Sequence, residues 1–212
     1  MSQQLNNIII LIHGFNKNKK DMYFLENKLK ETGHKVLNID LPATFGTMEE
    51  CRNSLHNQIK NVIKTHKKIS YISHSMGGLI IRDYINHFKQ KNINKCIFIA
   101  TPHKGSKLAE IVNFIPFYSK IFKPIKILLP SNNVNLLKLN KNIQIGLIAG
   151  NKDNSIFGKL FLKNQNDGSV EVSSARTDET NNIIILNFGH KEIHKKNITF
   201  EYINNFLLNG NF

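Results

Sequence analysis

Short apolar segments rich in β-branched residues alternate with amphipathic segments along almost the whole chain. We expect the apolar segments to be strands at residues 8–12, 35–39, 69–73, 95–100, 143–149 and 183–187. Their continuous apolar character is typical of strands that are covered on both faces, as in a parallel sheet. Residues 21–31, 48–66 and 198–208 carry apolar side chains at helical spacing, with Thr47 as the expected N-cap of the second helix. The alternation predicts an α/β fold with a doubly wound, mostly parallel sheet.

The length and composition fit one globular unit. A chain of 212 residues can bury roughly 70% of its unfolded surface in one core, so we expect a single domain over residues 1–212. No internal repeat or low-complexity linker divides it. The two cysteines, Cys51 and Cys96, fall on an expected helix and an expected strand without metal-ligand spacing. They are expected to be small core residues rather than reactive thiols.

The charge and the N-terminal segment bear on partners and location. The net charge of +14, from 29 basic and 15 acidic residues, would attract anionic surfaces. The lysines are scattered over nearly all expected loops and helices without interleaved aromatic residues, so no nucleic acid partner is expected. Residues 1–7 contain no basic region, and the apolar run at 8–12 is too short for a signal peptide or a membrane span. We therefore expect a cytoplasmic protein.

The segment Ser73-His74-Ser75-Met76-Gly77-Gly78 lies between an expected strand and an expected helix. A serine at such a sharp turn presents its hydroxyl to a base, and the N–H after it points to where an oxyanion would form. A serine beside glycines also occurs in plain turns. The segment nevertheless resembles the nucleophile elbow of the α/β-hydrolases, Gly-x-Ser-x-Gly, with Ser73 in place of the first glycine.

Three further motifs follow the order found in bacterial lipases and esterases of that superfamily. His13-Gly14-Phe15 ends the first expected strand, where the family builds its oxyanion hole. Thr101-Pro102-His103-Lys104-Gly105-Ser106 resembles the family's Thr-Pro-His-x-Gly-Ser segment. Asn166-Asp167-Gly168 resembles the loop that carries the catalytic aspartate, and His190 follows Asp167 by 23 residues. The resemblance covers residues 8 to 208 and implies a compact α/β-hydrolase with a short helical cap.

The resemblance implies a catalytic triad in the chain order Ser75, Asp167 and His190, and no metal or organic cofactor. It implies that the backbone N–H groups of Phe15 and Met76 form the oxyanion hole. Position alone leaves alternatives open. Asp153 also follows the penultimate strand, and His194 also follows the last one, although His194 is expected to be a surface or capping residue.

Further residues are expected around the substrate. The resemblance places His13, Gly14, His74, Thr101, Pro102 and His103 near the pocket. The side chain of His13 is expected to fix its loop by hydrogen bonds rather than to act as the base. Residues 108–139 are apolar, basic and interrupted by prolines, as in a cap or lid of short helices. Within this expected lid, Phe114, Phe117 and Phe122 are the residues expected to face the pocket.

We predict a serine hydrolase of carboxylic esters, a lipase or esterase. The alternatives are a thioesterase or acyltransferase on the same scaffold, or a non-catalytic protein that binds lipid surfaces. The lid combines aromatic residues with Lys120, Lys123 and Lys126, so peripheral contact with anionic lipid is a hypothesis for it. The alternative is that these side chains only cap the pocket.

Overall fold

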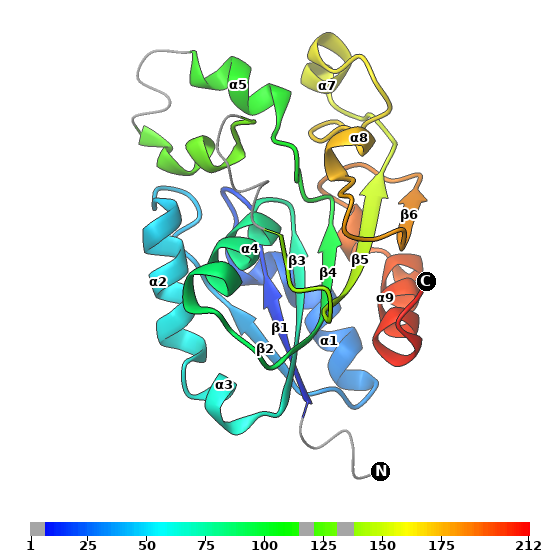
Figure 1. Cartoon of the computed structure of the whole chain (residues 1–212). Coiled ribbons are helices and arrows are strands. Elements are labelled where there is room, and N and C mark those ends of the chain that lie inside the picture. The colour runs from blue at the N-terminus through cyan, green and yellow to red at the C-terminus, as the bar shows by residue number, and fades with distance from the viewer. Residues whose placement is uncertain (1–6, 115–120, 131–137) are drawn as a thin grey trace.

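The computed structural model describes residues 7–114, 121–130 and 138–212. Its centre is a sheet of six parallel strands in the order β2-β1-β3-β4-β5-β6 (Figure 1). The predicted fold class is confirmed, and the expected strands match to within about two residues. The strands are β1 (Asn7–Ile12), β2 (Val36–Ile39), β3 (Lys68–His74), β4 (Ile93–Ile99), β5 (Gln144–Gly150) and β6 (Ile183–Leu186).

Helices cover both faces of the sheet because the strands are apolar on both faces. In β1, Ile8, Ile10 and Ile12 point into one core, while Ile9 and Leu11 point into the other. The first core is closed by α2 (Met48–Ile59) and α4 (Met76–Phe88). The second is closed by α1 (Tyr23–Glu31) and α9 (Asn197–Asn209). This is the layered arrangement that the alternating sequence predicts.

The second expected helix differs from the structure at its end. Thr47 caps α2 as predicted, because its hydroxyl accepts from Glu50 N while the Glu50 carboxylate accepts from Thr47 N. The helix ends at Ile59, and a separate turn, α3, spans Val62–Thr65. Lys60 and Asn61 between them keep helical backbone angles. Asparagine is among the weaker helix formers, which agrees with an interruption at this point.

The region predicted as a lid forms short helices. α5 (Lys107–Asn113) and the 3₁₀ helix η3 (Lys123–Leu128) lie beyond the carboxyl ends of the strands, with Pro124 inside the first turn of η3. On the other side of this edge lie α7 (Ile156–Phe161) and α8 (Val172–Ala175). Phe117 and Lys120 fall outside the described residues. Within the described ranges, no helix has the length and apolarity needed to cross a membrane.

Both cysteines lie in the core, as predicted. Cys51 and Cys96 are free and fully buried. Burial raises the pKa of each thiol to about 12. Because the thiolate is the reactive form, both side chains are poor nucleophiles at neutral pH.

Candidate active site

Ser75 occupies a strained turn between β3 and α4. Its backbone angles are φ 53° and ψ −128°, a conformation that non-glycine residues rarely adopt. Such strain persists only where the surroundings enforce it, and it is concentrated at functional sites. Here Ser75 N donates to Ile99 O, and the Thr101 hydroxyl donates to Ser75 O. The turn is thus fixed from β4 and from the loop that follows it.

Three glycines allow the backbone to pass close to this turn. A Cβ atom at Gly14 would lie 2.9 Å from the Ser75 Cβ, and one at Gly77 would lie 2.6 Å from His13 O. At Gly78 a Cβ would overlap the Thr101 side chain. The sequence therefore needs glycine at all three positions for β1, β3 and α4 to meet here. As a result, the loop after β1 lies directly against Ser75.

The structure brings Ser75, His190 and Asp167 together from three loops at the carboxyl edge of the sheet. Ser75 Oγ lies 3.0 Å from His190 Nε2, and His190 Nδ1 lies 2.8 Å from Asp167 Oδ2. The imidazole can therefore donate from Nδ1 to the carboxylate and accept at Nε2 from the serine hydroxyl. Such a series of hydrogen bonds from serine through histidine to aspartate can activate an oxygen nucleophile.

The loop that carries Asp167 holds the carboxylate firmly. Its Oδ1 atom accepts hydrogen bonds from Ser169 N at 3.0 Å and from Val170 N at 2.7 Å. Gly168 adopts φ +90°, which the turn requires and which glycine adopts without strain. His190 N donates to Asp167 O, so the backbones of the two loops are also joined. The side chain of Asp167 is only 1% exposed, and its second oxygen, Oδ2, contacts the histidine.

The alternative acid and base, Asp153 and His194, have no hydrogen bond or ion pair with Ser75 or with each other within the described residues. Asp153 accepts from Ser155 N at the start of α7. Ser73 is fully buried within β3. The expectation that His194 is a surface or capping residue is wrong, because it is buried at 1% exposure. It lies in a 3₁₀ turn, η5 (Ile193–Lys195), whose Ile193 forms part of the second core.

Two predicted pocket histidines have structural contacts. His13 accepts from Leu41 N at Nε2, which leaves Nδ1–H to donate to Gly14 O, so it fixes the loop after β1 as expected. His103 accepts at Nδ1 from Arg82 Nε, and it is buried. Arg82 in turn pairs with Glu179 at 2.6 Å. This network joins α4, the loop after β4 and the loop after α8.

A cavity of about 340 Å³ opens at Ser75 and His190. A second cavity of about 800 Å³ adjoins it and shares Leu108, Val112 and His190. The residues that line the first cavity are largely apolar and include Gly14, Phe15, His74, Pro102, Ala109, Ile125, Leu128 and Val170. Thr101 and His103, which were also expected near the pocket, are buried and do not line this cavity. An apolar hollow with a few polar groups at one end suits an acyl chain beside a reactive serine.

The predicted aromatic residues of the lid occupy different environments. Phe122 packs on Phe15 and Phe45, with ring centroids 6.1 and 5.7 Å apart. Phe114 ends α5 and is 84% exposed, so it does not fill the cavity. Two aliphatic residues of the predicted lid, Ile125 and Leu128, line the cavity instead.

Comparison with known proteins places this geometry in a family. A sequence profile of the family described as palmitoyl protein thioesterase matches residues 8–149. The matched segment runs from β1 into β5 and includes the elbow, and it makes up more than half of the chain. The chain belongs to this family.

Individual proteins similar to this chain share between about a fifth and a third of their residues with it over the aligned segments. Triacylglycerol lipase 2 of Saccharomyces cerevisiae is 34% identical over 92 residues, which cover 40% of this chain and 28% of the lipase. GPI inositol-deacylase of Xenopus laevis is 29% identical over 139 residues, covering 59% of this chain and 14% of that protein. The chain thus spans less than a third of either relative. The mature lipase BlEst2 of Bacillus licheniformis has a TM-score of 0.78 at 21% identity, over 96% of this chain and 91% of its own. It shares the α/β-hydrolase fold.

Burial around the site of this palmitoyl protein thioesterase family member predicts a pH-dependent stability. Desolvation lowers the pKa of four histidines below the usual 6.5, and those of two fall well below it. The four are His13, His194, His74 and His103, the last two with the larger shifts. Such a group takes up a proton on unfolding, so stability is lost as the pH falls through the unfolded value near 6.5. Below the unfolded value and above the folded one, the loss is about 1.4 kcal/mol per pH unit for each histidine, and above the unfolded value it is small.

We therefore expect the free energy of unfolding to fall by about 2–3 kcal/mol between pH 7.5 and 5.5 from His74 and His103 together. Urea unfolding at the two pH values measures this free energy. The slope of the free energy against urea concentration should be the same at both, which shows that the unfolded state has not changed. The carboxylate of Asp21, whose pKa is lowered, affects stability only below its unfolded value near pH 4. Equal free energies at pH 7.5 and 5.5 would contradict the prediction.

Proposed function

We propose that the protein is a serine hydrolase that cleaves carboxylic esters. His190 Nε2 takes the proton of Ser75 Oγ as this oxygen attacks the acyl carbonyl, and Asp167 holds the imidazole and stabilises the imidazolium. The protonated His190 then donates its proton to the leaving alcohol, which departs and leaves an acyl-enzyme. Water, activated by the same histidine, releases the acid and frees Ser75. The observation that carries the proposal is the pair of contacts at 3.0 and 2.8 Å that joins the three side chains.

The oxyanion hole in this proposal is made by the backbone N–H groups of Phe15 and Met76. Met76 is the first residue of α4, and the first N–H groups of a helix have no partner within it. Phe15 follows Gly14, which brings the loop after β1 into contact with Ser75. Each donor of this kind contributes roughly 3–4 kcal/mol to the stability of the transition state. The helix N-terminus adds its positive dipole end at the same place.

Two kinds of relatives support hydrolysis of an acyl substrate. The relatives include proteins named triacylglycerol lipase and lipase, and the family profile is named for a thioesterase. Esters and thioesters react through the same acyl-enzyme, so the triad serves either leaving group. The apolar lining beside Ser75 supports an acyl chain as the part of the substrate that the site holds.

A serine-directed fluorophosphonate probe tests the proposal. Labelling of the wild type at Ser75, found by mass spectrometry of the labelled peptide, supports a catalytic serine. A chain that is folded but not labelled would contradict it and would favour a non-catalytic protein that binds lipid surfaces. Denatured protein serves as the control, because it has no activated serine.

Thioester hydrolysis is the second candidate, and the family match favours it. An acyl ester and a thioester of the same acyl chain, assayed side by side, separate the two functions by their kcat/KM values. A ratio above about tenfold in favour of the thioester, which corresponds to about 1.4 kcal/mol in the transition state, would make thioesterase the better description. Transfer of the acyl group to an added alcohol in place of water would instead indicate an acyltransferase.

We also propose that the cap docks on anionic lipid. Large exposed apolar side chains occur on both sides of the cavities, at Ile111, Phe114 and Ile121 in the cap and at Ile156, Leu160 and Phe161 on α7. Two of these side chains, Ile111 of α5 and Phe161 of α7, line the second cavity. Lys123 and Lys126 of the cap are exposed. Each basic residue near an anionic lipid surface contributes about 1 kcal/mol to binding.

The change of Lys120, Lys123 and Lys126 to glutamate is expected to abolish co-sedimentation with anionic vesicles at low salt. The matched control changes Lys64, Lys67 and Lys68, which are exposed at the opposite end of the sheet, and should retain most of the binding. Both triple variants change the net charge equally. Negligible binding of the wild type to anionic and neutral vesicles alike would contradict docking and leave a cap that only covers the pocket.

A further inference from the structure

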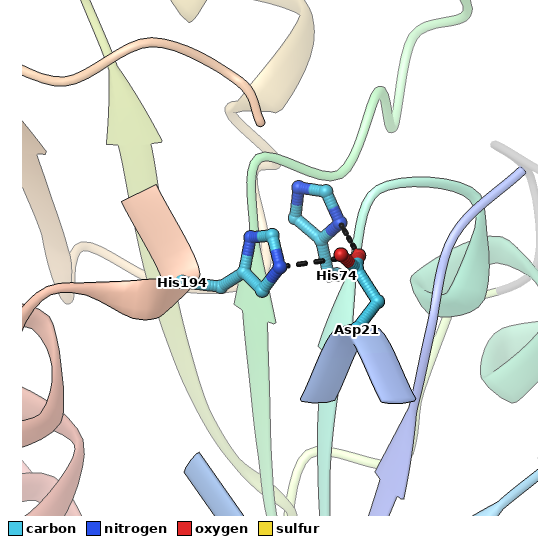
Figure 2. Close-up of side chains that lie close together, drawn as sticks. All are labelled: Asp21, His74 and His194. Carbon is cyan, nitrogen blue, oxygen red and sulfur yellow. Dashed lines mark ion pairs between the residues drawn. The ribbon is translucent and has the colours of Figure 1, made fainter. Parts of the chain in front are cut away.

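A cluster of three buried side chains lies directly behind the candidate active site. Asp21 comes from the 3₁₀ helix η2 (Lys19–Met22) after β1, His74 is the last residue of β3, and His194 lies in η5. Figure 2 shows the carboxylate of Asp21 facing the ring edges of both histidines. The Asp21 Oδ2 atom lies 3.1 Å from His194 Nε2 and 3.8 Å from His74 Nδ1. One ligand atom from each residue falls within 4.8 Å of the others.

His74 has a hydrogen bond outside the cluster, and this bond fixes which ring nitrogen carries the proton. The other nitrogen then presents its lone pair to the cluster. His74 Nε2 lies 3.0 Å from His190 O, and a carbonyl oxygen only accepts, so Nε2 carries the proton. Burial lowers the pKa of His74 well below its usual value, so the ring is neutral and Nδ1 has a lone pair. This lone pair points at Asp21 Oδ2, which is also an acceptor. Two buried acceptors that face each other repel unless a hydrogen-bond donor or a cation lies between them.

The remaining polar atoms of the cluster lack hydrogen-bond partners of good geometry. Asp21 Oδ2, His74 Nδ1 and both ring nitrogens of His194 have none within the described part of the chain, although His194 Nε2 is close to the carboxylate. His74 and His194 are 3% and 1% exposed, so bulk water does not solvate them. Lys195 Nζ pairs with the other carboxylate oxygen, Oδ1, at 2.6 Å, and its side chain extends to the surface. Oδ2 faces the two histidines.

We propose that Asp21, His74 and His194 bind one zinc ion. Two imidazole nitrogens and a carboxylate oxygen are a ligand set that suits zinc, whereas calcium and magnesium prefer oxygen alone. Zinc bonds of about 2.0 Å in a tetrahedron place ligand atoms about 3.3 Å apart, and the two pairs with Asp21 are 3.1 and 3.8 Å apart. The rings of His74 and His194 stack with centroids 4.0 Å apart, so they must rotate to direct both nitrogens at one ion. The His74 N–H that donates to His190 O is the kind of second contact that orients metal-bound histidines. The family resemblance implied no metal, and the three ligands come from positions 21, 74 and 194, which form no local motif.

A zinc ion at this place would act on the structure of the site rather than on the substrate. It would join the residue before Ser75, the turn after His190 and the loop after β1 into one unit. His190 would then be held from behind through its own carbonyl oxygen. The proposal does not rest on the proposed hydrolase function, and metal binding can be measured whether or not the protein cleaves esters.

Zinc titration of the metal-free protein tests the proposal by calorimetry and by elemental analysis after dialysis. We expect one zinc per chain and a rise in the melting temperature that EDTA reverses. Cobalt in place of zinc should give the visible absorption bands of a tetrahedral site. Asp21→Asn and His194→Gln should each weaken zinc binding by more than about tenfold. Even the loss of a group that only hydrogen-bonds to a metal ligand lowers metal affinity by about 10–100-fold.

Two control variants separate binding at this cluster from binding elsewhere on the protein. Lys195→Gln removes the cation from Asp21 but keeps all three ligands, so its zinc affinity should equal or exceed that of the wild type. His66→Gln removes a histidine far from the cluster and controls for adventitious binding on the surface. If Asp21→Asn does not fold, the His194→Gln titration and the cobalt spectrum of the wild type decide. Absent binding, or equal binding by wild type and by both ligand variants, would overturn the proposal.

Discussion

Ser75→Ala is expected to lower ester hydrolysis by about 10⁴-fold or more while the protein stays folded, since removing one member of a triad costs that much in other hydrolases. The Ser75 hydroxyl has a contact with His190 Nε2, and the backbone of the turn is held by separate hydrogen bonds from Ser75 N and to Ser75 O. The loss of one side-chain hydrogen bond costs only about 1 kcal/mol of stability. Steady-state kinetics and urea unfolding of the variant measure the two effects.

Ser73→Ala is the matched control for this variant. Ser73 is two residues away in β3, fully buried, and its hydroxyl has no hydrogen-bond partner among the described residues. Its replacement should therefore leave activity within about tenfold of wild type and keep or raise stability. Activity of Ser75→Ala within about tenfold of wild type would show that another residue is the nucleophile.

The sheet could be predicted from sequence because every strand is apolar on both faces. A strand such as β1 must place Ile10 in one core and Leu11 in the other, so only a sheet with helices on both sides can bury it. The strand ends were less certain, since burial does not stop sharply at a residue. The split of the helix after Thr47 could not be predicted either, because residues 60 and 61 include no proline or glycine.

The candidate site could be predicted where its residues follow strand ends and could not where contacts cross the chain. The loops after parallel strands converge at one edge, which brings the segments of Ser75, Asp167 and His190 together. The environment of His194 depends on Asp21, which is far away in the sequence, and no local pattern reports this contact. Its place just before the last helix indicated a surface or capping residue, whereas the structure stacks its ring on His74 and places it against Asp21.

The second large effect concerns the acid of the triad. Asp167→Asn is expected to lower kcat by about 10³–10⁴-fold, because an amide in place of the carboxylate favours the wrong tautomer of His190 and no longer stabilises the imidazolium. Oδ2 is the atom that contacts His190 Nδ1 at 2.8 Å, while Oδ1 accepts the backbone N–H groups of Ser169 and Val170. An amide oxygen retained at Oδ1 keeps those bonds, so the NH₂ group must face His190 Nδ1. The ring can then accept at Nδ1 and must carry its proton on Nε2, where it cannot take the proton of Ser75.

Asp153→Asn is the control, because it makes the same chemical change in the alternative carboxylate. Asp153 accepts from Ser155 N at the start of α7, and an amide oxygen can accept that bond equally well. We expect kcat within a few-fold of wild type for this variant, and unchanged KM for both if neither aspartate contacts the bound ester. The rate constants of the two variants under saturating ester, with unfolding curves to show that both are folded, decide the assignment. A large loss in Asp153→Asn with a small loss in Asp167→Asn would transfer the role of the acid to Asp153, and equal small losses would mean that His190 works without a carboxylate partner.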